Sequence, residues 1–332
     1  MNDKVYVVVL NYKNSTDTLV CLESLLSLSY DNFEIILVDN FSNDGSLEVI
    51  GNVISSLSLD GSVNSSRYDS HLELLEKSGK NGRSINVVLS ESNKGFAGGN
   101  NLGISLALSR SDADYICVLN TDTLVSPDAL SCLLERAEFY KIKKKKVGII
   151  GSKLKYLENP DTLQGIGGVY NKLWGTSNHV GDGEVDSGQY DFEGAFENVD
   201  YPIGASMFVS TSFIADVGLM AEYYFLYFEE LDWANRGREK DWSIGYCWEG
   251  DIYHKCGGTI GSSNDWREKS AVSDYYCLRN RALITYTHYP LYLGTVSLGY
   301  GVALINRVRR GQFKRLLDYG RWLIRDVKLW LS

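Results

Sequence analysis

The first 150 residues alternate short, continuous apolar runs with segments of helical periodicity, and this alternation restricts the fold more than any other feature of the chain. Apolar runs are predicted as strands at residues 5–10, 33–38, 85–89, 115–119 and 147–150. Helices are predicted between them at residues 15–28, 46–57, 99–108 and 127–140. Strands that are apolar throughout are typical of sheets covered by helices on both faces. The pattern therefore predicts an α/β fold with a mostly parallel central sheet and right-handed crossovers.

Beyond residue 150 the pattern is less regular. Strands are predicted at residues 203–210, 243–248 and 251–254, and helices are predicted to begin near residues 213 and 233. The segment 55–84 is rich in Ser, Asn and Gly, and it is predicted as a surface insertion with at most one short helix, at residues 71–77.

Charge and cysteine content restrict the partners and the compartment. The chain of 332 residues has a net charge of −9, which argues against a nucleic-acid-binding protein. Its six cysteines show no CxxC spacing and lie largely in apolar runs, as expected of buried thiols in a reducing compartment. The first predicted strand begins within five residues of Met1, where a signal peptide would otherwise lie. We therefore expect a cytoplasmic protein.

Polar side chains follow three of the predicted strands: Asn11, the pair Asp39-Asn40, and the tripeptide Asn120-Thr121-Asp122. Because parallel strands end at one edge of a sheet, these side chains should converge where open α/β sheets bind ligands. Asp39 can accept a hydrogen bond from a nucleotide base, and Asn11 can hold a ribose or a base edge. The tripeptide suits a divalent cation, since Mg²⁺ takes one or two carboxylates together with substrate phosphates. Taken alone, it is also typical of a capped turn.

A glycine-rich loop, residues 93–101, joins the third predicted strand to a helix. It is neither a P-loop nor a G-x-G-x-x-G motif. Gly95 and the glycines after it let the backbone approach a ligand closely, and Lys94 or the N-terminus of the following helix can face a phosphate. Asn100 lies in the same loop.

Together these segments resemble the inverting family-2 glycosyltransferases with the nucleotide-binding GT-A fold, and in particular their rhamnosyltransferase-like branch. The resemblance covers residues 4–285 and rests on four stretches, namely residues 8–12, 36–42, 93–100 and 119–122. It implies that Asn11, Asp39 and Asn40 contact the base and ribose of the nucleotide. The family carries an Asp-x-Asp metal site where this chain has Asn120-Thr121-Asp122. Asp122 is therefore expected to carry most of the binding of Mg²⁺ or Mn²⁺, and Asn120 is a departure that weakens it.

The second half of the chain supplies the expected acid–base chemistry. Residues 225–233, with the cluster Glu229-Glu230-Leu231-Asp232, resemble the family's Phe-Glu-Asp-x-Asp stretch. The resemblance places the catalytic base at Glu230, beside Glu229, and leaves Asp232 as an alternative. Without it, the cluster is typical of a helix N-terminus, whose dipole favours carboxylates.

Two further residues match family positions. His254 lies where related enzymes supply a histidine to the metal or the diphosphate. Arg279 lies in a Tyr-x-x-x-Arg-Asn stretch and can neutralise a diphosphate, since a guanidinium matches phosphate geometry. A structural role remains an alternative for each. Trp174, Trp233 and Trp266 are candidate surfaces for sugar stacking or core residues.

The C-terminal end is basic and amphipathic. Residues 307–332 contain eight basic and two acidic residues, with apolar residues at helical spacing among them. Such a helix suits an anionic membrane surface, and packing on the catalytic domain or on a second subunit is the alternative. Residues 286–332 are thus predicted as a helical extension of a domain at residues 1–285, itself divided into a nucleotide-binding half (1–150) and an acceptor half (151–285).

These observations predict a metal-assisted enzyme that transfers a sugar, with rhamnose as the first candidate, from a nucleoside diphosphate donor to a hydroxyl of a cell-surface or lipid-linked glycan. One alternative is a sugar nucleotidyltransferase, which would need a glycine-rich, basic loop after the first strand. Residues 11–14 contain no glycine. The other is a non-catalytic protein that binds nucleotide sugars or glycans, in which the Glu229–Asp232 cluster would have no role.

Overall fold

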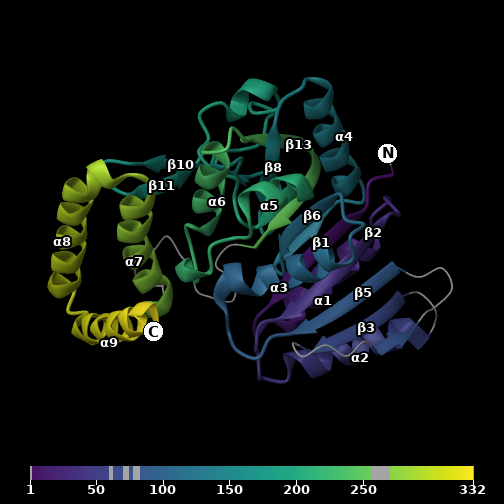
Figure 1. The fold of residues 1–332 in the computed structure, drawn as a ribbon, viewed down its shortest axis with the longest axis horizontal. Helices are drawn as coiled ribbons and strands as arrows, with labels where there is room; N and C mark the ends of the chain where they lie inside the picture. The colour runs from purple at the N-terminus through teal and green to yellow at the C-terminus, as the bar shows by residue number, and fades with distance from the viewer. Residues whose placement is uncertain (1, 60–62, 70–74, 78–82, 256–269, 332) are drawn as a thin grey trace. The chain divides into compact units, whose positions relative to one another are not determined.

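The computed structural model describes residues 2–59, 63–69, 75–77, 83–255 and 270–331, and it divides into two compact units (Figure 1). The first unit contains Met1–Val169 and Asn178–Thr259, and the second contains Tyr170–Ser177 and Ile260–Ser332. The predicted domain boundary at residue 285 stays a prediction.

A parallel sheet forms the centre of the first unit, as the apolar runs predict. Its strands follow the order β3 (Val63–Asp69), β5 (Arg83–Leu89), β2 (Phe33–Asp39), β1 (Val5–Asn11) and β6 (Tyr115–Asn120). All four pairings between these neighbours are parallel. The connections contain helices α1 (Ser15–Leu26), α2 (Ser46–Leu59) and α3 (Gly95–Ser109).

The sheet continues beyond β6 with mixed pairing. Strand β12 (Ser206–Ser210) lies antiparallel between β6 and β8 (Val147–Tyr156), and β13 (Ser243–His254) runs parallel to β8. The short strands β4 (Leu75–Lys77), β7 (Thr123–Val125) and β9 (Leu163–Gly165) pair antiparallel with β3, β13 and β8. Helices α4 (Ala129–Ile142), α5 (Thr211–Val217) and α6 (Glu229–Arg238) complete this half, and a separate hairpin joins β10 (Gly168–Asn171) to β11 (Thr176–His179).

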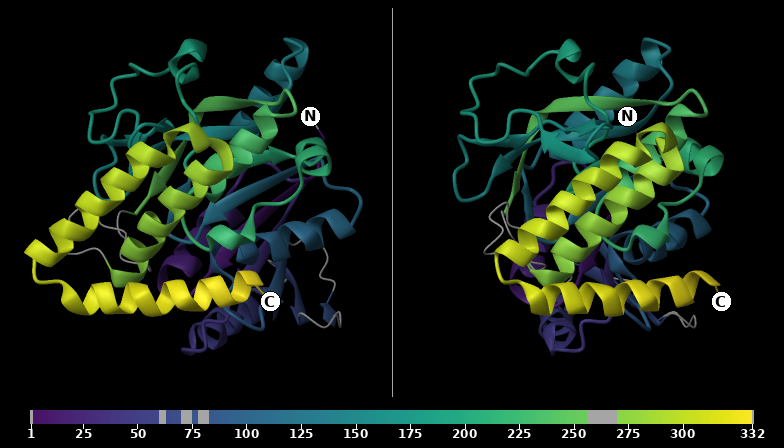
Figure 2. Two further views of the ribbon diagram at one scale, coloured as in Figure 1. Left: turned by 60° about the vertical axis from the view of Figure 1, so that its left-hand side comes forward. Right: turned by 90° about the vertical axis from the view of Figure 1, so that its left-hand side faces the viewer.

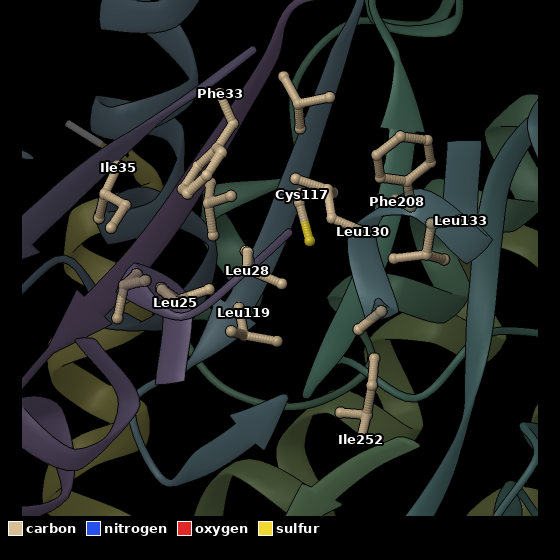
Figure 3. Close-up of a cluster of buried hydrophobic side chains, with 14 of the residues drawn as sticks. Leu25, Leu28, Phe33, Ile35, Cys117, Leu119, Leu130, Leu133, Phe208 and Ile252 are labelled. Carbon is tan, nitrogen blue, oxygen red and sulfur yellow. The ribbon is translucent and has the colours of Figure 1, made fainter. Parts of the chain in front are cut away.

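Side chains of the central strands alternate between two buried clusters on opposite faces of the sheet. In β1, Val7 and Val9 pack with α1, α2 and α4, whereas Tyr6 and Val8 pack with α3, α5 and α6. Figure 3 shows part of the first cluster, where Leu25 and Leu28 lie near Leu119. Both faces of each central strand are therefore apolar, which explains the continuous apolar runs in the sequence.

Two predictions of secondary structure are wrong. The segment 55–84 contributes β3, which extends the parallel sheet, so it is more than a surface insertion. The helix predicted at residues 71–77 is contradicted at residues 75–77, which form β4, while residues 71–74 lie outside the described residues. The strands predicted at 243–248 and 251–254 are one strand, β13, whose register shifts between Cys247 and Ile252.

The second unit contains the helices α7 (Ala271–His288), α8 (Leu293–Arg309) and α9 (Phe313–Leu331). Figure 2 shows α7 and α8 side by side, with α9 across one end of the pair. Buried ion pairs connect these helices: Asp274 of α7 accepts from Arg307 of α8 at 2.9 Å, and Arg279 of α7 lies 2.8 Å from Asp326 of α9. In the described part of the chain, no helix combines the length and the apolar character that a membrane span requires.

Candidate active site

The ends of β1 and β2 share one polar cluster. Asn11 and Asp39 are partners in the strand register, and the side-chain amide of Asn11 donates to Asp39 Oδ1 at 2.8 Å. Asp39 also accepts from the backbone N–H of Ser42 at 3.1 Å and from its hydroxyl at 2.6 Å. Asn11 is completely buried, whereas 5% of Asp39 is exposed. The predicted contact of Asn11 with the nucleotide stays a prediction, and its burial suits a residue that orients Asp39.

Asn40 connects the end of β2 to the glycine-rich loop. Its amide nitrogen donates to Asn93 Oδ1 at 3.1 Å and to the carbonyl of Gly95 at 3.0 Å, and its amide oxygen accepts from the backbone N–H of Lys94 at 2.9 Å. Lys94 is the N-cap of α3, so the helix begins at Gly95 rather than at residue 99 as predicted, and most of the glycine-rich loop is its first turns; the Lys94 side chain is exposed. Within the described residues, Asn100 Oδ1 is buried without a hydrogen-bond partner. The predicted donor-binding residues of the first half therefore lie at one edge of the sheet.

His254 lies between Asn120 and Asp122 because β13 pairs with β7 next to the tripeptide. Its Nε2 is 3.0 Å from Asp122 Oδ1 and 3.3 Å from the amide nitrogen of Asn120. Its Nδ1 lies 2.7 Å from Gln164 Oε1 in β9. An amide oxygen only accepts, so Nδ1 carries a proton and Nε2 faces the carboxylate. Nε2 thus faces both the Asp122 carboxylate and the Asn120 amide nitrogen, which can donate to it or give way to a cation.

The donor set at this point fits a divalent cation that is bound jointly with a diphosphate. Over the part of the chain that the structure describes, no three His, Cys, Asp or Glu side chains gather into a complete metal site. Asp122 and His254 nevertheless supply a carboxylate oxygen and an imidazole nitrogen at one place. Mg²⁺ and Mn²⁺ accept such a partial set, because water and substrate phosphates provide the remaining ligands.

The acidic cluster forms the first turn of α6. Glu229 is 3% exposed, and one carboxylate oxygen each of Glu229 and Glu230 is buried without a hydrogen-bond partner among the described residues. Burial raises the pKa of Glu230 to about 7. Burial, and after it the negative charge of Glu230, raises the pKa of Glu229 well above its ordinary value. Glu230 can therefore take up or release a proton near neutral pH.

Glu230 lies close to the end of β6. A Cβ placed on Gly204 would be 3.6 Å from Glu230 Oε1 and 3.6 Å from the ring of Phe96. The next residue, Ala205, accepts a hydrogen bond from the backbone N–H of Asn120 at 3.1 Å. Residues 204–205 thus bring the carboxylate, the glycine-rich loop and the predicted metal tripeptide into one region of the first unit.

Asp232 and Arg279 have other partners. Asp232 is completely buried and accepts from Arg236 Nε at 2.7 Å, so its carboxylate is part of an ion pair within α6. Arg279 belongs to the second unit, where its guanidinium and Asp326 are both almost fully buried. Their roles as an alternative base and as a diphosphate ligand stay predictions, and the structure gives each a structural role.

The tryptophans separate into three cases. Trp233 is completely buried and packs in the core, which agrees with the structural alternative. Trp174 is half-exposed and belongs to the second unit. Trp266 lies outside the described residues.

Residues 6–143 match the model of the family described as glycosyl transferase family 2. The match runs from β1 into the C-terminal end of α4, and it includes Asp39, the glycine-rich loop and Asp122. This match, together with the two relatives named below, shows that the chain is a glycosyltransferase.

Two relatives carry names that agree with this assignment, and one solved structure bears on the fold. The glycosyltransferase is 23% identical over 287 residues to the low-salt glycan biosynthesis hexosyltransferase Agl10 of Haloferax volcanii, covering 85% of this chain and 76% of that protein. It is 32% identical over 142 residues to the amylovoran biosynthesis glycosyltransferase AmsB of Erwinia amylovora, covering 42% and 38%. The mannosyltransferase PcManGT of Pyrobaculum calidifontis, solved with GDP-Man and Mn²⁺, aligns with a TM-score of 0.52 at 11% identity, over 98% and 85% of the two chains. The last likeness confirms the predicted GT-A-like α/β fold.

The sequence did not identify Gln164 as part of this region, nor the contacts that Ser42 and Phe225 make in it. Gln164 orients His254, and Ser42 donates to Asp39. Ser42 ends the stretch 36–42 that carries the family resemblance, whereas Gln164 belongs to no recognisable motif, and only the pairing of distant strands brings it to His254. Phe225 was named within the acidic stretch, but its backbone contact with the glycine-rich loop gave no signal in the sequence.

Proposed function

We propose that this glycosyltransferase moves a hexose, with rhamnose as the first candidate, from a nucleoside diphosphate donor to a hydroxyl of a cell-surface or lipid-linked glycan, with inversion at the anomeric carbon. One observation carries the proposal. A carboxylate whose pKa is near 7, Glu230, lies beside the strand end that holds Asn120 and Asp122. An acid–base group next to a diphosphate site is what direct displacement requires.

Glu230 acts as the general base. The acceptor hydroxyl oxygen attacks the anomeric carbon, the bond from that carbon to the diphosphate oxygen breaks, and the hydroxyl proton passes to Glu230. One displacement inverts the configuration, and the electron pair leaves with the nucleoside diphosphate. Asp232 remains the alternative base, but its ion pair with Arg236 makes it the weaker candidate.

Asp39 and Asn40 hold the base and ribose, and Asn11 keeps the Asp39 carboxylate in place. Lys94 and the N-terminus of α3 face the diphosphate, since backbone N–H groups and a lysine both favour phosphate there. Asp122 and His254 hold Mg²⁺ or Mn²⁺, with Asn120 beside them. When bound, the cation neutralises charge that develops on the departing diphosphate.

We propose that the enzyme meets its glycan acceptor at a membrane surface. Phe313, Leu317 and Ile324 are exposed along one side of α9, and Arg321 is exposed next to them. An exposed apolar stripe with basic neighbours suits an anionic bilayer. A lipid-linked glycan would be presented at that surface.

Glu230→Gln tests the base. Turnover should fall by about 10²–10⁴-fold, because the amide cannot accept the proton, while the affinity for nucleoside diphosphate in the presence of Mn²⁺ should stay within about threefold. Thermal shifts with UDP, GDP and dTDP first identify the nucleotide. Calorimetry then gives its Kd, and release of nucleoside diphosphate from the corresponding nucleotide sugar gives kcat. Glu135→Gln, on the exposed side of α4, is the matched control. Wild-type turnover in Glu230→Gln would show that another residue is the base.

A further inference from the structure

The glycine-rich loop crosses the segment before the acidic cluster in close contact at Gly95. Gly95 has a φ of +71°, and a Cβ placed on it would lie 2.1 Å from the carbonyl oxygen of Phe225 and 2.7 Å from its ring. The backbone N–H of the next residue, Phe96, donates to that same oxygen at 2.7 Å. Only glycine satisfies both the left-handed angle and the space at position 95.

The segment held by this contact has an unusual backbone. Phe225, Tyr227 and Phe228 have φ values of 64°, 70° and 73°, and Glu229 follows immediately. A bulky residue in the left-handed region costs about 1–3 kcal/mol, so such a conformation persists only where its surroundings impose it. The contact with residues 95–96 is one such restraint.

Helix α3 holds the same segment at a second point. The side-chain amide of Asn101 donates to Glu222 Oε1 at 3.0 Å. Glu222 in turn accepts, through its carbonyl, from the backbone N–H of Phe225 at 3.0 Å. The first two turns of α3 therefore fix the chain on the N-terminal side of the strained residues, and the conformation of residues 225–228 sets where α6 begins.

The other side of the loop belongs to the proposed donor site. The carbonyl of Gly95 accepts from Asn40, and Asn40 is adjacent to Asp39. A continuous path thus runs from the nucleotide-binding strand end, through the peptide group of Gly95, to Phe225 and on to the start of α6. Each step in this path is a hydrogen bond or a covalent bond.

We infer that Gly95 is a positioning residue: its crossing with Phe225 sets the position of the Glu230 carboxylate and links that position to the donor-binding loop. The inference rests on the proposed function, because it assumes that Glu230 is the base. It assigns to the glycine-rich loop a second role besides contact with the donor. A base displaced by about 1 Å can lower the rate by about a hundredfold without weakening substrate binding.

Gly95→Ala, compared with Gly311→Ala, tests this inference. Gly311 has a φ of +69° and no atom within 4 Å of an added Cβ, so the control carries the same backbone strain without the collision. In Gly95→Ala, kcat should fall by about tenfold to a hundredfold relative to the control, a larger factor than the rise in the Kd for nucleoside diphosphate with Mn²⁺. The acidic limb of the kcat–pH profile should move to lower pH as Glu230 becomes less buried.

Phe225→Gly is the second variant, in case Gly95→Ala fails to fold by thermal melting. It removes the ring that packs against position 95 and widens the range of backbone angles open to residue 225, so the start of α6 is held less firmly and the same separation of kcat from Kd is expected. Wild-type kcat and pH profile in whichever of these variants folds would overturn the inference. If Glu230→Gln is inactive while the Gly95 and Phe225 variants are fully active, the positioning contact alone is wrong. If Glu230→Gln is active, the proposed base is wrong.

Discussion

At the scale of single residues, the molecule places two neighbouring carboxylates where burial opposes their ionisation. Glu229 and Glu230 each have a buried oxygen without a hydrogen-bond partner among the described residues, and the pKa of each is raised. In a helix N-terminus exposed to solvent, carboxylates would instead be ionised and favourable. Burying two carboxyl groups in this way costs folding free energy, and such an arrangement is typical of active sites.

The raised pKa values of these two carboxyl groups predict how the free energy of unfolding depends on pH. A carboxyl group whose pKa is higher in the folded than in the unfolded chain makes the folded chain bind more protons. Its contribution to the free energy of unfolding is therefore greatest below the unfolded pKa of about 4.3, and it falls as the pH rises toward and through the folded pKa. Glu229→Gln removes this dependence for one group. Its melting temperature should exceed that of the natural chain at pH 8, by about 2–4 °C for each kcal/mol released, and should approach it at pH 4. Equal melting temperatures at pH 8 would contradict the burial of Glu229.

At the scale of elements, the metal-binding candidate depends on strands that are far apart in the sequence. Strand β9 brings Gln164 to one nitrogen of His254, and β13 and β7 bring its other nitrogen to Asp122. The tripeptide and the histidine could be named from the sequence, because each follows a recognisable strand or family motif. Gln164 could not, since its role comes only from the pairing of β9 with β8.

Gln164→Leu should therefore weaken nucleotide binding in Mn²⁺ by about 10–100-fold, because His254 loses the hydrogen bond that orients its ring. Gln164→Glu should retain most of the affinity, since a carboxylate also accepts from Nδ1. Calorimetric titration of nucleoside diphosphate with Mn²⁺ and with EDTA separates the metal-dependent part. Asp122→Ala should remove that part. Unchanged metal dependence in Asp122→Ala and Gln164→Leu would exclude a metal role for this cluster.

Helix α9 illustrates how packing selects one face of a predicted helix. The sequence offers membrane contact and packing on protein as alternatives for its amphipathic character. In the second unit, Tyr319 and Asp326 are buried on one side of the helix, where Asp326 meets Arg279. The stripe of Phe313, Leu317 and Ile324 remains exposed. Packing therefore uses a polar and aromatic face, and the apolar stripe remains available.

At the scale of the whole molecule, the chain joins an α/β unit to a helical unit, each with its own buried contacts. Deleting residues 312–332 would remove Asp326 and leave the buried Arg279 without this partner, at a cost of about 3–5 kcal/mol. Point substitutions on the exposed stripe avoid this damage, so they are the better test of membrane association.

Leu317→Ser combined with Ile324→Ser should abolish co-sedimentation with vesicles of phosphatidylcholine and phosphatidylglycerol, because each buried apolar side chain contributes about 1.5–3 kcal/mol to such binding. Ile142→Ser removes a comparably exposed apolar residue from the α/β unit and should leave binding unchanged. Vesicles of phosphatidylcholine alone test the contribution of the basic residues. Failure of the natural chain to bind either vesicle would remove membrane contact from the proposal.

The sequence by itself determined the α/β class, the parallel core, and the strand-end positions of Asn11, Asp39 and Asn120. Continuous apolar runs can be buried only between two layers of helices, and parallel strands end at a common edge. The tertiary structure decided what local patterns do not contain. In it, the segment 55–84 adds β3 to the sheet, and Gln164 contacts His254. Asp232 forms an ion pair with Arg236, and Gly95 lies against the carbonyl of Phe225. Each of these depends on contacts between residues distant in the chain, which periodicity and propensity do not encode.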